Sequence, residues 1–146
     1  MGAKGNTFIN DLLKLLFNNT AIANIGDAGG LQPSAAAGVL YVSLHTADPG
    51  AGGSQNTSEA AYPGYARIGV ARSGAGWTVT GQSVSPAAMI QFPPGTGVGE
   101  LCTFAAVGTS LNGAGKVLYR GALTPNITTG NGITPQIPTT AALSES

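Results

Sequence analysis

The chain has 146 residues, of which only 8% are Asp, Glu, Lys or Arg, against about 25% in an ordinary soluble domain. Six basic residues balance six acidic ones, so the formal net charge is zero and binding to bare nucleic acid is disfavoured. Because 42% of the residues are hydrophobic, the composition is that of a folded domain, and a surface this neutral favours assembly with other protein.

Two further features limit the class of protein. Cys102 is the only cysteine, so we expect no internal disulfide. The one concentrated apolar run, residues 12–17, is too short to cross a membrane and contains Lys14. The N-terminus lacks a basic segment followed by a long apolar stretch, so we expect folding in a cytoplasm and no membrane partner.

The first predicted element is a helix over Thr7–Asn18, for which Asn6 or Thr7 offers a side-chain N-cap. At about 100° per residue its apolar side chains sweep roughly 200° of the circumference, which is wider than one core-facing stripe. Such a helix is either buried in its own domain or in contact with a second subunit, and we favour the second, because a small β domain has little bulk to cover both sides. The interface candidates on this helix are Phe8, Leu12, Leu15 and Leu16.

A glycine-rich segment, residues 26–38, is predicted to be a linker. It separates an N-terminal helical arm, residues 1–25, from a predicted β-sandwich domain, residues 39–146. The first strand of that domain is Val39–His45, in which apolar and polar side chains alternate. We expect the long loop that follows, Thr46–Gly64, to become ordered by contact with a neighbouring protein, because long loops tend to be functional or disordered.

Short apolar segments with turn signals between them predict the remaining strands. They are Tyr65–Arg72, Trp77–Thr80, Ala87–Phe92, Glu100–Val107, Lys116–Leu123 and Ile133–Ile137, with a further short strand near residues 141–144. We expect the first two to form a hairpin, and the prolines at 125, 135 and 138 to confine the last region to an edge or to irregular structure. Seven or eight short strands without helices between them predict an all-β sandwich or small barrel with one N-terminal helix.

No group of residues predicts catalysis or metal binding. Ser43, His45 and Asp48 lie close together, but nothing marks a nucleophile elbow or an oxyanion hole. We interpret His45, the only histidine, as a structural residue that bonds the following turn. Asp48 and Glu59 flank the glycine-rich loop, and two carboxylates make a weak calcium site. We therefore expect a protein that is not an enzyme and has no metal site and no cofactor.

Two tyrosines in the long loop and just after it are additional interface candidates. Tyr62 and Tyr65 surround Pro63 and Gly64, and a tyrosine offers both contact area and a hydroxyl group. A role in core or loop packing is left open for both. Trp77 is predicted to lie in the core.

Four segments carry a resemblance to known proteins: LHTADP at 44–49, SEAAY at 58–62, GYAR at 64–67 and GKVLY at 115–119. In them, and most clearly over residues 39–138, the chain resembles the capsid cement, or decoration, proteins of short-tailed bacteriophages such as those of Bordetella. The resemblance implies a non-enzymatic, jelly-roll-like β domain. It also implies a homodimer on the outer capsid surface of the virion, where the protein would bind the major capsid protein and cement neighbouring subunits. Related sequences resemble tail and fibre components, so a tail or fibre adhesion module that binds a host surface ligand is the alternative.

Overall fold

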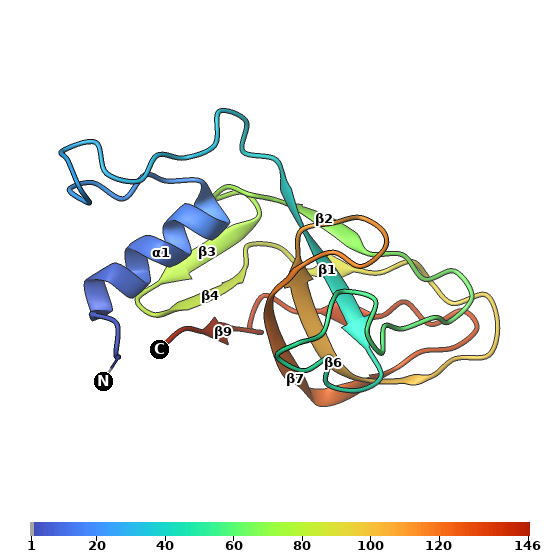
Figure 1. Ribbon diagram of the computed structural model, residues 1–146. Helices are drawn as coiled ribbons and strands as arrows, with labels where there is room; N and C mark the ends of the chain where they lie inside the picture. The colour runs from blue at the N-terminus through green and yellow to red at the C-terminus, as the bar shows by residue number, and fades with distance from the viewer. Residues whose placement is uncertain (1) are drawn as a thin grey trace. The chain divides into compact units, whose positions relative to one another are not determined.

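The structure, a computed structural model, describes residues 2–146 and is mostly β with one N-terminal helix (Figure 1). The described residues form nine strands in sheets of four, three and two strands. The expected all-β fold class, with one N-terminal helix and the character of a β-sandwich, is confirmed. No helix in this part of the chain is long and apolar enough to span a membrane.

The chain divides into two compact units, each assembled from segments that are far apart in the sequence. The helix unit consists of the segment up to Val39, Ala71–Ala88 and Pro138–Ser146, and the sheet unit consists of Leu40–Val70 and Met89–Ile137. This grouping differs from the expected consecutive division into an arm (1–25), a linker (26–38) and a sandwich (39–146). The reason is that the helix packs on strands that come much later in the chain.

The helix unit contains one helix on a small sheet. Its elements are α1 (Asn6–Asn18), β3 (Trp77–Thr80), β4 (Ser83–Pro86) and β9 (Leu143–Ser144), with the strands in the order β3-β4-β9. One stripe of the helix is buried against β3 and β4, through Ile9, Leu13 and Phe17. Trp77 lies in this core as predicted, with its ring 4.9 Å from that of Phe17 in an edge-to-face arrangement.

Two local predictions for this unit are wrong. The helix N-cap is Gly5, without a side-chain cap, because the Asn6 carbonyl oxygen Oδ1 instead accepts a hydrogen bond from Gln82 Nε2 at 3.1 Å. The hairpin partner of β3 is β4, which sequence reasoning missed, and not Tyr65–Arg72. Gly81, at φ 58°, and Gln82 form the two-residue turn that reverses the chain between these strands.

The sheet unit is built on a four-stranded sheet in the order β2-β1-β6-β7. Its strands are β1 (Val39–His45), β2 (Ile68–Ala71), β6 (Leu101–Gly108) and β7 (Val117–Thr128), and a separate pair is formed by β5 (Ile90–Gln91) and β8 (Gln136–Ile137). The bounds predicted for β1 are confirmed. The strand is more buried than its alternation suggested, because Ser43 and His45 on the second face are buried as well.

The other predicted strands differ mainly in length. Only four residues of Tyr65–Arg72 form β2. Strand β7 is longer than the predicted Lys116–Leu123, because a register shift against β6 lets it continue past Pro125 to Thr128. Of the last predicted strand, Ile133–Ile137, only Gln136–Ile137 is extended, in the two-stranded pair with β5, so the region is an edge strand with irregular flanks as its prolines predict.

The long loop over residues 46–64 is held in place by its own chain. The Gln55 side chain is fully buried, and its Oε1 accepts a hydrogen bond from Ser110 N at 2.8 Å. A Cβ atom added to either Gly108 or Gly115 would lie 2.1 Å from an atom of this side chain, so both positions require glycine. These contacts fix the Gln55 side chain of the loop against the connection between β6 and β7.

Candidate functional site

The first candidate surface is one side of α1, which we call the helix flank, formed by Phe8, Leu12, Leu15 and Leu16. These predicted interface residues lie next to the buried stripe on the helix. Phe8 is 39% exposed, and the three leucines are half-buried. The 13-residue helix thus has more apolar surface than its own unit covers completely.

Asparagine side chains on the remaining helix surface attach α1 to the hairpin. Asn10 Nδ2 donates to the carbonyl oxygen of Gly81 at 2.8 Å, and Asn18 Nδ2 donates to that of Trp77 at 2.9 Å. At about 100° per residue, these side chains lie away from Phe8 and Leu12. The hydrogen bonds therefore fix the rotation of the helix so that the helix flank is the side left partly uncovered.

Arg72 holds the end of the same helix. Its Nη2 and Nε donate to the carbonyl oxygens of Leu15 and Leu16, both at 2.7 Å. These carbonyls belong to the last turn, where helical partners are missing and a positive charge is favourable. Further donation to Ser34 and Ala37 fastens the following segment, so the helix flank is presented on a rigid support.

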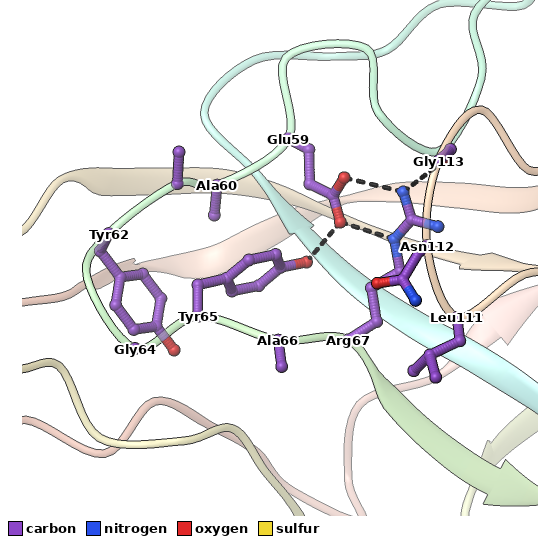
Figure 2. A pocket seen from close by; sticks show the side chains of 11 residues that line it. Glu59, Ala60, Tyr62, Gly64, Tyr65, Ala66, Arg67, Leu111, Asn112 and Gly113 are labelled. Atoms are coloured by element: carbon purple, nitrogen blue, oxygen red, sulfur yellow. Dashed lines mark hydrogen bonds and ion pairs between the residues drawn. The ribbon is translucent and has the colours of Figure 1, made fainter.

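The second candidate surface is an open cleft of about 380 Å³ in the sheet unit, shown in Figure 2. We call it the tyrosine cleft. Its lining residues are Glu59, Ala60, Ala61, Tyr62, Gly64, Tyr65, Ala66, Arg67, Leu111, Asn112 and Gly113. Segments before β2 and between β6 and β7 supply these residues, so the cleft lies where two connections of the sheet meet.

An ion pair between Arg67 and Glu59 holds these connections together. Arg67 Nε lies 2.6 Å from Glu59 Oε1, and Arg67 Nη2 lies 2.8 Å from Oε2, which is the two-point geometry of a strong pair. The same guanidinium donates to the carbonyl oxygens of Ser110 and Gly113, at 2.9 and 2.7 Å. Hydrogen bonding to Glu59 raises the pKa of Arg67, which is only 6% exposed. The positive charge of Arg67 is therefore neutralised inside the protein.

The hydroxyl groups of both tyrosines that were predicted as interface candidates form hydrogen bonds within the protein. The Tyr65 hydroxyl donates to Glu59 Oε1 at 2.9 Å and accepts from Leu44 N at 3.2 Å, and the Tyr62 hydroxyl donates to Pro93 O at 2.8 Å. Burial raises the pKa of Tyr62 to about 12 and raises that of Tyr65 as well. Tyr65 is half-buried, whereas Tyr62 lies in the interior and not on the surface that an interface candidate would occupy.

His45 lies in the interior of the sheet unit and does not line the cleft. Its Nδ1 is 2.9 Å from the carbonyl oxygen of Thr57, and its Nε2 is 2.9 Å from Ser43 Oγ. Because a carbonyl oxygen only accepts, Nδ1 carries the proton and Nε2 accepts from the serine. Burial lowers the pKa of His45, which favours this neutral form. The expected bond to the turn after β1 is thus replaced by one to Thr57, farther along the loop.

The two carboxylates weighed as a calcium site also have other partners. Asp48 Oδ1 accepts from Gly50 N at 2.8 Å and from Arg120 Nε at 2.7 Å, and both bonds lower the pKa of Asp48. Glu59 belongs to the Arg67 ion pair. Among the described residues, no three His, Cys, Asp or Glu side chains come together in a way that could hold a metal ion.

Sequence reasoning missed Arg67 and Gln55, which organise the sheet unit. Neither residue belongs to a segment in which apolar and polar residues alternate regularly. The sequence pattern therefore does not predict that their side chains are buried. The scarcity of charge is the one available clue for Arg67, because a chain with so few charged residues has few partners for Glu59.

The model of a family described as Podophage GP4 fiber I protein gp80 matches residues 4–143 of the chain. The match takes in the whole of α1 and the residues of the tyrosine cleft. No curated protein matches the chain.

Proposed function

The chain belongs to the podophage GP4 fiber I protein gp80 family, and from this membership we propose that it is a fibre component of a short-tailed phage. At the coarser level it is a bacteriophage structural protein and part of the virion. The observation that carries the proposal is the family match, because it extends over nearly the entire chain.

The geometry supports a role in assembly. The helix flank offers apolar side chains on a helix whose rotation and end are fixed by Asn10, Asn18 and Arg72. Aliphatic and aromatic residues that are removed from water on docking supply most of the stability of such contacts. A chain with zero net charge adds no repulsion between copies or neighbours.

The interior of the sheet unit supports a role without catalysis. His45 and Ser43 have no exposed surface, and both ring nitrogens of His45 have partners. The Arg67 ion pair joins the segments around the tyrosine cleft and leaves no unpaired charge there. We propose that this network acts to keep the loops of a structural protein rigid.

Capsid cement protein is the second candidate function, and one observation favours it. Attachment of many copies to a symmetric shell suits modest, uncharged contacts that add up over the lattice, and only 8% of this chain is charged. In this version the helix flank would contact the major capsid protein on the outer head surface, and the protein would be a homodimer.

Labelling of intact particles distinguishes a fibre component from a capsid cement protein. Purified virions would be incubated with a gold-conjugated Fab raised against the protein, and in parallel with a Fab against the major capsid protein as a head marker. We expect gold from the first Fab at the tail end, on the fibres. Gold spread over the whole head, coinciding with the head marker, would overturn the fibre proposal in favour of the cement protein.

A further inference from the structure

The dipeptide Asn-Gly occurs twice in the chain, at residues 112–113 and 131–132. The first pair lies in the connection between β6 and β7 and lines the tyrosine cleft, and Figure 2 shows it beside the Arg67 guanidinium. An asparagine before a glycine is chemically reactive, because the glycine has no Cβ to shield its backbone nitrogen from the neighbouring carboxamide. The structure shows which of the two pairs is poised to react.

The two pairs are alike in exposure and in backbone conformation. Asn112 and Asn131 are both exposed, and so are the glycines that follow them. Gly113 has φ 76° and Gly132 has φ 74°, and no atom lies within 4 Å of a Cβ added to either glycine. Neither steric access nor local sequence therefore distinguishes one pair from the other.

The two pairs differ in the hydrogen bonds of the glycine nitrogens. Gly132 N donates to the carbonyl oxygen of Gly95 at 2.8 Å, and Gly95 also forms a β-bridge with Asn131. Within residues 2–146, Gly113 N has no hydrogen-bond partner, and neither has the Asn112 carboxamide. The backbone nitrogen is therefore held by another group at the second pair and is available to the neighbouring carboxamide at the first.

We propose that Asn112 is a site of spontaneous deamidation. Gly113 N gives up its proton and forms a bond to Cγ of Asn112, while the side-chain nitrogen takes up a proton and leaves as ammonia. The product is a cyclic succinimide. Water then adds to one of its carbonyl carbons and breaks that C–N bond, which gives aspartate or isoaspartate. Water is the only co-reactant, and nothing is oxidised or reduced.

The modification would act on the Arg67 network. Arg67 Nη2 donates to the carbonyl oxygen of Gly113 at 2.7 Å, directly after the peptide bond that reacts. Isoaspartate inserts a methylene group into the backbone just before this glycine, so the carbonyl oxygen is displaced from the guanidinium. We expect the connection around the tyrosine cleft to loosen as the protein ages. This chemistry does not depend on where the protein lies in the virion.

The test follows both pairs in one sample of the purified protein. The folded protein is incubated at mildly acidic and at mildly alkaline pH, and a second sample is incubated in denaturant. Peptide mapping by mass spectrometry, with fragmentation that distinguishes aspartate from isoaspartate, measures conversion at Asn112 and Asn131. The denatured chain is the control for intrinsic reactivity. Asn112→Gln is the control variant, because its longer side chain closes the ring less readily.

We expect conversion at Asn112 to be about tenfold faster than at Asn131 in the folded protein, because the Gly132 hydrogen bond must break first. The rate at Asn112 should rise with pH, since the attacking nitrogen must lose its proton. In denaturant the two rates should become similar. Equal rates in the folded protein, or faster conversion at Asn131, would overturn the proposal. Unmodified Asn112 in a folded sample, while the denatured chain converts, would overturn it as well.

A second measurement tests the effect on the Arg67 network. The midpoint of denaturant unfolding should fall with incubation time in the wild-type protein and should fall less in Asn112→Gln. An unchanged midpoint in wild-type protein that has been converted at Asn112 would overturn the proposed loosening of this connection.

Discussion

Arg67 and Glu59 meet at two points, with Nε 2.6 Å from Oε1 and Nη2 2.8 Å from Oε2. Only 3% of the arginine side chain and 15% of the glutamate side chain are exposed. The pair joins the segment before β2 to the connection between β6 and β7, because Arg67 also donates to Ser110 and Gly113. Its removal should therefore affect the whole sheet unit.

Glu59→Gln should lower the free energy of unfolding by about 3 kcal/mol, because it leaves the buried charge of Arg67 without its counterion. Denaturant unfolding measures this change. The matched control is Asp48→Asn, which breaks the exposed pair with Arg120 and should alter stability very little. Equal effects of the two substitutions would show that the Arg67 pair has no special role.

Gly108→Ala should destabilise the protein by about 1 to 3 kcal/mol, the usual range for overpacking. The added Cβ would lie 2.1 Å from Cδ of the buried Gln55 side chain. Gly52→Ala is the control from the long loop, because no atom lies within 4 Å of its added Cβ. Thermal unfolding of both variants checks the prediction, and an unchanged midpoint in Gly108→Ala would contradict the close packing around Gln55.

Stability should fall as the pH is lowered through the range just below 6.5, the ordinary pKa of histidine. Burial lowers the pKa of His45 in the folded protein, so the unfolded chain takes up the proton first. The contribution is fully present above pH 6.5 and is lost progressively down to the lowered pKa of the folded state. His45→Gln should flatten this part of the curve of unfolding free energy against pH, since no other histidine is present. A wild-type curve that is already flat there would refute the prediction.

Leu12→Asp should weaken assembly into the particle more than it weakens the fold, because Leu12 lies on the half-buried helix flank. Leu13→Asp should instead cost more than about 3 kcal/mol of unfolding free energy, because this neighbour is 1% exposed and would bury an unpaired charge. Incorporation into particles and denaturant unfolding are measured for both variants. Normal incorporation of a folded Leu12→Asp protein would exclude the helix flank as an assembly surface.

Attachment to particles that lack the protein should survive an increase from about 0.1 to 1 M salt, because salt screens exposed charges but leaves apolar contacts intact. Exposure of Arg67, Arg72 or Arg120 would weaken this expectation. Arg67 and Arg72 have internal partners, whereas Arg120 pairs with Asp48 at the surface, with 36% of its side chain exposed. Titration at several salt concentrations measures the affinity. A tenfold loss would show that a few charged contacts dominate.

The parts of the fold that the sequence predicted are those with regular burial. Strand β1 alternates in sequence and lies between two neighbours, and α1 has a continuous apolar stripe, so both have the predicted type and nearly the predicted bounds. Strand β4 was missed because Ser83–Pro86 is short and ends in a proline, which argues against a strand by itself. Its strand conformation depends on the turn at Gly81 and on pairing with β3.

The organisation of the tyrosine cleft was beyond sequence reasoning for a different reason. Gln55, Glu59 and Arg67 are polar residues in irregular segments, where exposure is the ordinary expectation. Gln55 and Arg67 are buried because both find partners in the connection between β6 and β7, which is distant in sequence, and Glu59 pairs with Arg67. Such long-range pairing leaves no local pattern. The two tyrosines indicated the location of the cleft. The sequence did not indicate that their hydroxyl groups point into the protein.

A reconstruction of the intact virion by cryo-electron microscopy tests the central claim most directly, because it shows both where the chain lies and what covers it. We predict density for the two units in the tail fibres, with Phe8 and Leu12 of the helix flank packed against another protein chain. Density on the head shell, or fibre density in which the helix flank faces solvent, would contradict this account.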